Sequence, residues 1–287
     1  MVSGFRNENV RVRGILILII SMLLLIIISP ATFCQQPDSL HYSRNLTLEE
    51  VSVIGQRTPS VYDQVARKIT VITKEEISSS PVSTIQDLLE YITSIDVRQR
   101  NVHGVQADVQ IRGGSFDQVM ILLNGVNISD HQTGHFNLDL PITLSSVERI
   151  EILHGSGSRI YGANAHKGVI NIITAKNLSN VTAEVSAGQY GLLNSSLAGN
   201  LSKGKFYNGL NVSRNVSDGF TSNTDYKLRN IFYQGGAYLK PLDVSWQTGL
   251  SNKAFGANNF YSPRFPEQFE ETGTMYGSLN LASKGKI

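Results

Sequence analysis

The chain has 287 residues, enough for two domains of ordinary size, and its 41% hydrophobic and 17% charged residues exclude a wholly disordered or fibrous protein. Its 25 basic and 23 acidic side chains give a net charge of +2, which offers no dense basic surface for a phosphate backbone, so nucleic acid is a poor candidate partner. The 25 glycines, 11 tyrosines and 11 phenylalanines favour strands and turns over a helical bundle.

Residues 1–34 have the layout of an export signal, because three arginines precede an apolar run from Ile15 to Ile28. A helix of that length spans about 21 Å at ~1.5 Å per residue, less than the ~30 Å hydrocarbon core of a bilayer, so a cleaved signal is favoured over an anchor helix. Cleavage after Cys34, the only cysteine, would leave Gln35 as the first residue of a mature chain without disulfides.

Residues 35–61 are mostly polar and predicted to be flexible, but they contain a short β-forming segment. Val51, Val53 and Ile54 favour extended backbone, and the segment ends at Gly55 without an obvious partner strand. It either adds as a strand to the sheet of another protein or forms the first strand of the domain that follows, and the residues alone leave both readings open.

Residues 62–176 are predicted to form a compact α/β domain. Thr73 followed three residues later by Glu76 is typical of a helix start, and residues 83–91 are amphipathic at helical spacing. A tight turn is predicted at Asn124-Gly125, directly after a wholly apolar strand. The predicted strands are 69–72, 119–123, 147–153 and 168–174.

Residues 177–287 contain six strand-like stretches in which apolar and polar residues alternate, as in Phe206, Leu210 and Val212, so one face meets an apolar environment and the other meets water. Short and long connections alternate between them, which is typical of outer-membrane strands with tight periplasmic turns and long external loops. A water-soluble β-sandwich shows the same alternation, so periodicity leaves both open. The stretches are 181–187, 192–202, 205–215, 226–240, 242–254 and 272–283.

Several of these segments together resemble the TonB-dependent outer-membrane receptors. The most specific likeness is the string from Val147-Glu-Arg-Ile-Glu-Ile-Leu-His-Gly155 through Tyr161-Gly-Ala163 to Gly168-Val-Ile-Asn-Ile-Ile173, which resembles the plug domain of that family. Softer likenesses are to the plug at 111–113 and 123–126, to the TonB box of Bacteroidetes-type receptors at 49–54, and to the early barrel of the vitamin B12 and siderophore branch at 217–226 and 255–261. The resemblance covers roughly residues 48–287.

The resemblance implies an α/β plug domain, a small mixed sheet with short helices, at residues 62–176, followed by antiparallel transmembrane β-barrel strands at 177–287. Receptors of this family close 22 strands around the plug, whereas six are predicted here, so we expect an incomplete barrel from a fragment or truncated product. The chain also departs from the family at His154, where an arginine is usual.

The implied function is TonB-dependent active transport of a scarce nutrient, such as a ferric siderophore or cobalamin, across the outer membrane. The implied partners are TonB with its ExbB/ExbD energy complex, outer-membrane lipid and a small chelate or vitamin, and the resemblance leaves room for a surface lipoprotein. The alternative is a non-transporting, plug-like module for ligand binding or signalling. We expect no enzyme, because no nucleophile elbow, phosphate loop or catalytic cysteine is present, and no cofactor.

The family layout assigns three sets of residues. TonB coupling falls to Glu49, Glu50, Val51, Ser52, Val53 and Ile54. Charge pairing between plug and barrel falls to Arg112, Arg149 and Glu151, with barrel partners of the arginines expected beyond Ile287. The substrate-facing plug loops carry Arg100, Asn101, His103, Gln106, Asp130, His131, His135 and Phe136. The four-residue spacing of His131 and His135 suits a metal only on a helix, so ordinary loop lining is favoured and no metal site is expected.

Overall fold

The computed structural model describes residues 52–53, 60–61, 68–130, 132–176, 180–240 and 242–283. All of them belong to one compact unit, Glu50–Ile287. The predicted export signal at 1–34 and most of the segment at 35–61 lie outside the described residues. Among the residues that are described, no helix is long and apolar enough to cross a bilayer.

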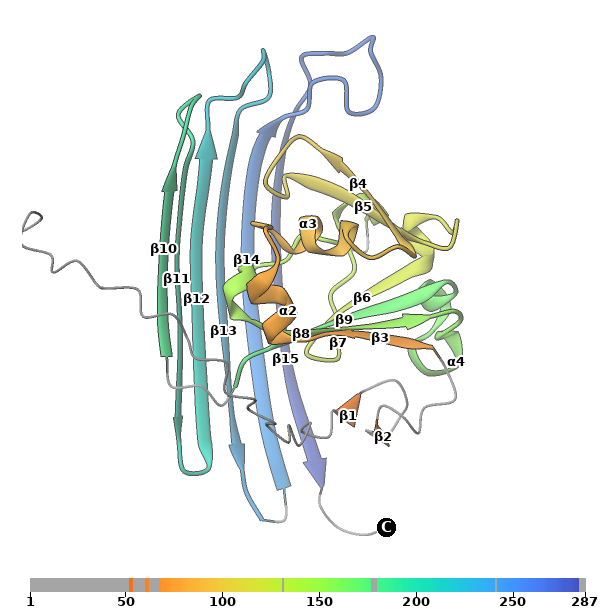
Figure 1. Cartoon of the computed structure of the whole chain (residues 1–287), viewed down its shortest axis with the longest axis vertical. Coiled ribbons are helices and arrows are strands. Elements are labelled where there is room, and N and C mark those ends of the chain that lie inside the picture. Colours follow the sequence, from red (N-terminus) through yellow and green to blue (C-terminus); the bar gives the residue numbers. More distant parts are fainter. Residues whose placement is uncertain are drawn as a thin grey trace, which may run out of the picture. The chain divides into compact units, whose positions relative to one another are not determined.

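Residues 68–176 form a small α/β domain (Figure 1). Its α-helices are α2 (Lys74–Ser79), α3 (Ile85–Glu90) and α4 (Ser158–Tyr161). Its strands are β3 (Ile69–Ile72), β4 (Ile95–Arg100), β5 (Gln106–Ile111), β6 (Val119–Leu123), β7 (Val126–Asn127), β8 (Val147–His154) and β9 (Gly168–Thr174). Short 3-10 turns are η2 (Phe116–Gln118), η3 (Gly134–Phe136), η4 (Leu144–Ser146) and η5 (Ala163–Ala165).

Both α2 and α3 begin at a capping box. Thr73 accepts a hydrogen bond from the backbone of Glu76, whose carboxylate accepts one from the backbone of Thr73. Thr84 and Asp87 make the same reciprocal pair at the start of α3. These bonds satisfy donors that a helix start leaves free, which allows helices of only six residues to form here. The predicted helix start at Thr73 is therefore confirmed.

The core of this domain is a five-stranded mixed sheet in the order β3-β8-β9-β6-β7. Strands β6 and β9 are parallel and every residue in both is buried, as expected for strands covered on two faces. The turn at Asn124-Gly125 has φ of 52° and 81°, the left-handed geometry that this dipeptide favours in a tight hairpin. The strands predicted at 69–72, 119–123, 147–153 and 168–174 are all present.

Strands β4 and β5 form a separate two-stranded hairpin from residues whose alternation is too loose to predict it. Ile95 and Val97 are buried while Asp96 and Arg98 are exposed, which is the ordinary pattern for one covered face. Strand β5 is almost wholly buried, including its polar side chains, so its sequence does not show the alternation of apolar and polar residues that predicts a strand. The loop between the two strands runs from Asn101 to Val105.

Residues 180–283 form one antiparallel sheet of six long strands in sequence order, which we call the wall (Figure 1). Its strands are β10 (Asn180–Ala187), β11 (Leu193–Lys203), β12 (Phe206–Ser217), β13 (Tyr226–Tyr238), β14 (Leu242–Gly256) and β15 (Phe269–Ser283). Each predicted stretch corresponds to one strand, with bounds that differ by three residues or fewer. Among the described residues, β10 and β15 each pair with only one neighbour, so the barrel is not closed.

Along the middle of the wall, one face exposes apolar residues and the other buries polar ones. One row of directly paired residues across five strands is apolar and between 38% and 77% exposed: Leu197, Val212, Ile231, Leu250 and Met275. In the next row, Ser213, Asn230 and Ser251 are no more than 8% exposed. A soluble sandwich buries its apolar face, so this arrangement excludes that reading and favours strands whose outer face meets lipid.

A short strand β1 (Ser52–Val53) pairs with β2 (Ser60–Val61). The pairing is antiparallel, with Ser52 opposite Val61 and Val53 opposite Ser60. The β-forming segment, which has no obvious partner strand in the sequence, therefore finds one in a strand seven residues further on. The predicted boundary between residues 176 and 177 stays a prediction, since 177–179 lie outside the described residues.

His154, the residue that departs from the family pattern, closes β8 as a buried imidazole. Its Nε2 lies 2.9 Å from the Thr70 hydroxyl and its Nδ1 3.3 Å from the Ser94 hydroxyl. Burial lowers the pKa of His154, and the nearby positive charges of Arg112 and Lys68 lower it further. The neutral imidazole is therefore the form that fits the folded domain.

This arrangement predicts a pH-dependent stability. Because the folded-state pKa of His154 lies below 6.5, its contribution is present above pH 6.5 and is lost as the pH falls toward the folded-state pKa. The urea midpoint of the domain should fall on acidification from pH 7.5, and His154→Gln should flatten that fall. The exposed His166 gives the control, since His166→Gln should keep the parent's dependence. A slope unchanged by His154→Gln would contradict this role.

Candidate functional site

The loop between β4 and β5 reaches the wall. Asn101 and His103 have positive φ values of 64° and 55°, so the chain turns sharply there. The Asn101 side chain donates to the carbonyl of Thr224 at 2.9 Å, and the His103 ring lies 6.2 Å from that of Tyr226. The predicted substrate-facing loop therefore contacts the loop that precedes β13 and the start of that strand.

Asp108 organises a cluster of polar side chains beside this loop. The Arg100 guanidinium donates to one of its carboxylate oxygens at 2.6 Å, and Nδ1 of His135 lies 2.9 Å from the other. Asp108 is 3% exposed, while Arg100 and His135 are 27% and 26% exposed. One buried carboxylate thus holds two partly exposed groups in fixed orientations. The structure brings together Arg100 and His135, two residues that are 35 positions apart in the sequence.

The long loop between β14 and β15 covers the same cluster. The carbonyl of Phe260 accepts from Arg100 at 3.2 Å, and the hydroxyl of Tyr261 accepts from the Gln106 amide at 2.9 Å. Gln106 is fully buried, and its Oε1 has no hydrogen-bond partner in the part of the chain that the structure describes. Burial raises the pKa of Tyr261 to about 12, so its hydroxyl stays protonated at neutral pH. The cluster is therefore built from both the small domain and the wall.

Aromatic rings border the imidazole of His135. Phe116 lies 4.4 Å and Tyr261 5.9 Å from it between ring centroids. Phe136, also predicted to face substrate, packs instead against a buried group that includes Tyr226 and Phe255. We call Arg100, Gln106, Asp108, His135 and Tyr261 the apical cluster. Asp108 and Tyr261 were missed by sequence reasoning, since nothing in their local pattern distinguishes them.

Asp130 has a local role in its loop. Its Oδ1 accepts hydrogen bonds from the backbones of Gln132 and Thr133 at 2.7 and 2.8 Å, which shapes the turn before η3. His131 lies outside the described residues. Within the parts of the chain that are described, no three His, Cys, Asp or Glu side chains gather in a way that could hold a metal ion.

A buried lysine ties the small domain to the wall. Nζ of Lys253, on β14, donates to the carbonyls of Gly104 and Val105 at 3.0 and 3.3 Å and to Asp139 at 2.6 Å. Lys253 and Asp139 are only 4% and 6% exposed. Burial raises the pKa of Asp139 and the Lys253 ammonium opposes that shift. Lys253 thus joins the β4–β5 loop and the segment after η3 to one strand. Sequence reasoning did not single out Lys253.

Two wall glutamines make a second, uncharged connection, to the ends of β6 and β9 in the small domain. Gln247 donates to the carbonyl of Leu123 at 3.0 Å, and Gln234 to that of Ala175 at 2.8 Å. The side chain of Asn124 donates in turn to Gln247 at 2.9 Å. The ends of β6 and β9 are thereby fixed to the wall through amides.

The residues predicted to pair charges between plug and barrel lie on β8 and at the end of β5. Nε of Arg149 is 2.9 Å from a carboxylate oxygen of Glu151, whose second oxygen accepts from Asn171 at 3.2 Å. Arg112 is exposed and has a positive φ of 49°. The pairing of these arginines with barrel glutamates stays a prediction.

The predicted TonB-coupling residues are described only in part. Ser52 and Val53 form β1, and its backbone pairs with β2. The other four, Glu49, Glu50, Val51 and Ile54, lie outside the described residues. Their role stays a prediction.

Comparison with known proteins gives consistent matches. The family model for the TonB-dependent receptor plug domain matches residues 62–169. The vitamin B12 transporter BtuB of Vibrio vulnificus (strain CMCP6) is 32% identical over 164 residues, which cover 57% of this chain and 27% of the relative. BtuB of Vibrio cholerae (strain O395) is 27% identical over 270 residues, which cover 85% of this chain and 43% of the relative. The chain therefore spans less than half the length of these curated relatives.

Solved structures match the same fold. The ferripyoverdine receptor of Pseudomonas aeruginosa aligns with a TM-score of 0.56 at 17% identity, over 70% of this chain and 27% of the receptor. The ferric yersiniabactin receptor FyuA of Yersinia pestis aligns with a TM-score of 0.51 at 18% identity, over 66% of this chain and 32% of the receptor. At such identities the likeness concerns the fold alone.

The buried ion pair yields a stability prediction. Lys253→Met should lower the free energy of unfolding by about 3–5 kcal/mol, because it leaves the Asp139 carboxylate buried without a partner. Adding Asp139→Asn should recover part of that loss, since the unpaired charge is then gone. Lys227→Met, at an exposed position on β13, is the control and should change little. Denaturant unfolding of the four proteins decides this, and a double variant no more stable than Lys253→Met would argue against the pair.

Proposed function

This chain belongs to the TonB-dependent receptors, and from that premise we propose that it serves the energy-driven uptake of a scarce nutrient across the outer membrane. The observation that carries the proposal is the polarity of the wall, whose apolar row faces outward while its polar row is buried toward the plug domain. Such a sheet suits a lipid-facing barrel that encloses a hydrophilic plug. It suits neither a soluble sandwich nor a free binding module.

The energy for uptake has to come from outside the outer membrane, which holds neither nucleotides nor an ion gradient. We propose that residues 49–54 add as a strand to TonB, the periplasmic protein that transmits work from the inner membrane. Main-chain hydrogen bonds would carry the load, and tension would pass along the chain to β3 of the plug. The short length of β1, two residues, makes its internal pairing weak enough to exchange for another strand.

For the cargo we propose a corrinoid of the vitamin B12 class. The support is that the similar curated proteins quoted above are named vitamin B12 transporters, at identities of 27% and 32%. The apical cluster is the proposed point of first contact. It offers a guanidinium, an imidazole and a phenol that Asp108 and Gln106 hold in place.

The coupling assignment can be tested with a proline on β1. Val53→Pro removes a main-chain donor and should reduce uptake of radiolabelled vitamin B12 by about tenfold or more, while binding to whole cells changes less than about twofold. Val53→Thr keeps the donor and is the matched control. Uptake that persists in Val53→Pro would refute the assignment. Binding without energy-dependent uptake in the parent itself would favour a non-transporting module.

The apical cluster can be tested through its central carboxylate. Asp108→Asn removes the charge that orients Arg100 and His135, and loss of charge-assisted hydrogen bonds worth about 1.5–3 kcal/mol should weaken vitamin B12 binding about 10- to 100-fold. Asp96→Asn is the control, because Asp96 pairs with Arg98 on the exposed face of β4. Equal affinities for the two variants would remove the cluster from the binding site.

A further inference from the structure

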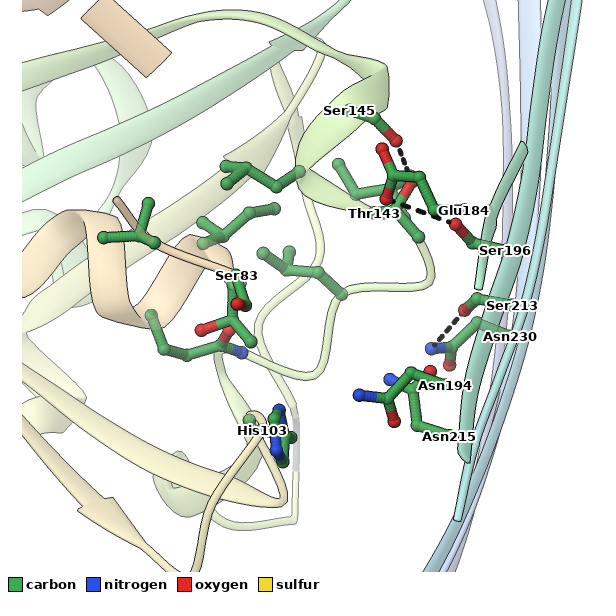
Figure 2. A pocket seen from close by; sticks show the side chains of 18 of the residues that line it. Ser83, His103, Thr143, Ser145, Glu184, Asn194, Ser196, Ser213, Asn215 and Asn230 are labelled. Atoms are coloured by element: carbon green, nitrogen blue, oxygen red, sulfur yellow. Dashed lines mark hydrogen bonds between the residues drawn. The ribbon is translucent and has the colours of Figure 1, made fainter. Parts of the chain in front are cut away.

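A cavity of about 660 Å³ separates part of the plug from the wall (Figure 2). On the plug side it is bordered by α2, the start of α3 and the segment before η4, and on the wall side by strands β10 to β14. Figure 2 shows Asn194, Ser196, Ser213, Asn215 and Asn230 along the wall, opposite Ser83, Thr143 and Ser145 of the plug. The residues that build the apical cluster do not line it.

The lining is rich in neutral hydrogen-bonding groups. Eleven lining residues carry a hydroxyl and four carry an amide, out of 29. The two lysines on the lining are already engaged, since Lys74 donates to the carbonyls of Ser145 and Val147 at 2.9 and 2.8 Å and Lys253 is held by Asp139. The Glu184 carboxylate also lines the cavity and accepts a hydrogen bond from Ser196 at 3.5 Å. Apart from these charged groups, the cavity presents uncharged donors and acceptors over most of its polar surface.

One wall amide has unused capacity. Oδ1 of Asn194, on β11, is buried and has no hydrogen-bond partner among the described residues. Its neighbours in the cavity are better satisfied, because Asn230 donates to Ser213 at 3.3 Å and accepts from Ser251 at 2.7 Å. A buried acceptor without a partner is costly, and a solute that donates a hydrogen bond would remove that cost.

The plug side of the cavity adds an apolar surface. Leu138, Leu140 and Ile142 line it, together with Ile77 and Ile85 of the two helices. The cavity is thus polar on the side of the wall and partly apolar on the side of the plug. Binding sites for small molecules commonly combine an apolar surface with a few placed polar groups, at volumes of about 300–1,000 Å³.

We propose that this cavity is a second binding station, which holds the amide- or hydroxyl-bearing part of an uncharged cargo as it moves from the apical cluster past the plug. The inference rests on the proposed transport function and adds to it the place and the chemistry of an intermediate stop. Ser196 and Ser213 are directly paired on β11 and β12 and form the polar rim. The β4–β5 loop lies between the two stations, with His103 and Gly104 on the cavity side.

The wall supplies a matched pair of positions for the test. Ser196 lines the cavity, whereas the next residue, Leu197, points outward and is 48% exposed. Ser196→Cys and Leu197→Cys are made in cells that produce the receptor and are treated, after assembly, with a bulky uncharged maleimide. The parent, whose one cysteine is Cys34, is treated in the same way as a reagent control. Vitamin B12 binding at the surface and energy-dependent uptake are then measured separately.

The expected result is that modified Ser196→Cys binds vitamin B12 within about twofold of the unmodified protein but loses about tenfold or more of its uptake, because the cavity is filled. Modified Leu197→Cys should keep both. Full uptake by modified Ser196→Cys, failure of the reagent to reach Cys at that position, or a joint loss of binding and uptake would each overturn the second station. Absence of energy-dependent uptake in the parent would instead count against the proposed transport function.

Discussion

The structure depends on one constraint: the polar side chains buried on the inner face of the wall, behind its exposed apolar row, have to be satisfied by hydrogen bonds. Ser213, Asn230 and Ser251 bond to one another along the paired row, and Gln234 and Gln247 bond to the plug. A buried polar group without a partner costs about 1–3 kcal/mol, so an inner face of this kind requires a polar plug or water beside it. The plug therefore complements the wall chemically.

The same constraint explains how plug and wall are joined. The connections at the ends of β6 and β9 are neutral amides, whereas those near the β4–β5 loop include the buried Lys253–Asp139 pair. Neutral hydrogen bonds can exchange for bonds to water at little net cost, while separating a buried ion pair costs more. The cavity lies beside these contacts, and its hydroxyl and amide lining continues the chemistry of the wall.

Much of the fold could be predicted from the sequence, because its signals are local. The capping pair at Thr73 and Glu76, the turn at Asn124-Gly125 and the period of the six wall strands each follow from a few neighbouring residues. The site could not be predicted in the same way. Asp108 joins Arg100 and His135 only once the hairpin and η3 meet, and the ion pair between Lys253 and Asp139 spans 114 positions. Even the partner of β1 was missed, because Ser60–Val61 carries too short a pattern to signal a strand.

The most direct test of the account is the environment of the two faces of β12. Spin labels at Leu210 and Asn211, which are 47% and 2% exposed, can be read in the membrane by collision with oxygen, which concentrates in lipid, and with a water-soluble nickel chelate. The account predicts that the label at Leu210 collides mainly with oxygen and that the label at Asn211 is immobile and shielded from both. A label at Leu210 that meets only the water-soluble chelate would contradict a lipid-facing wall.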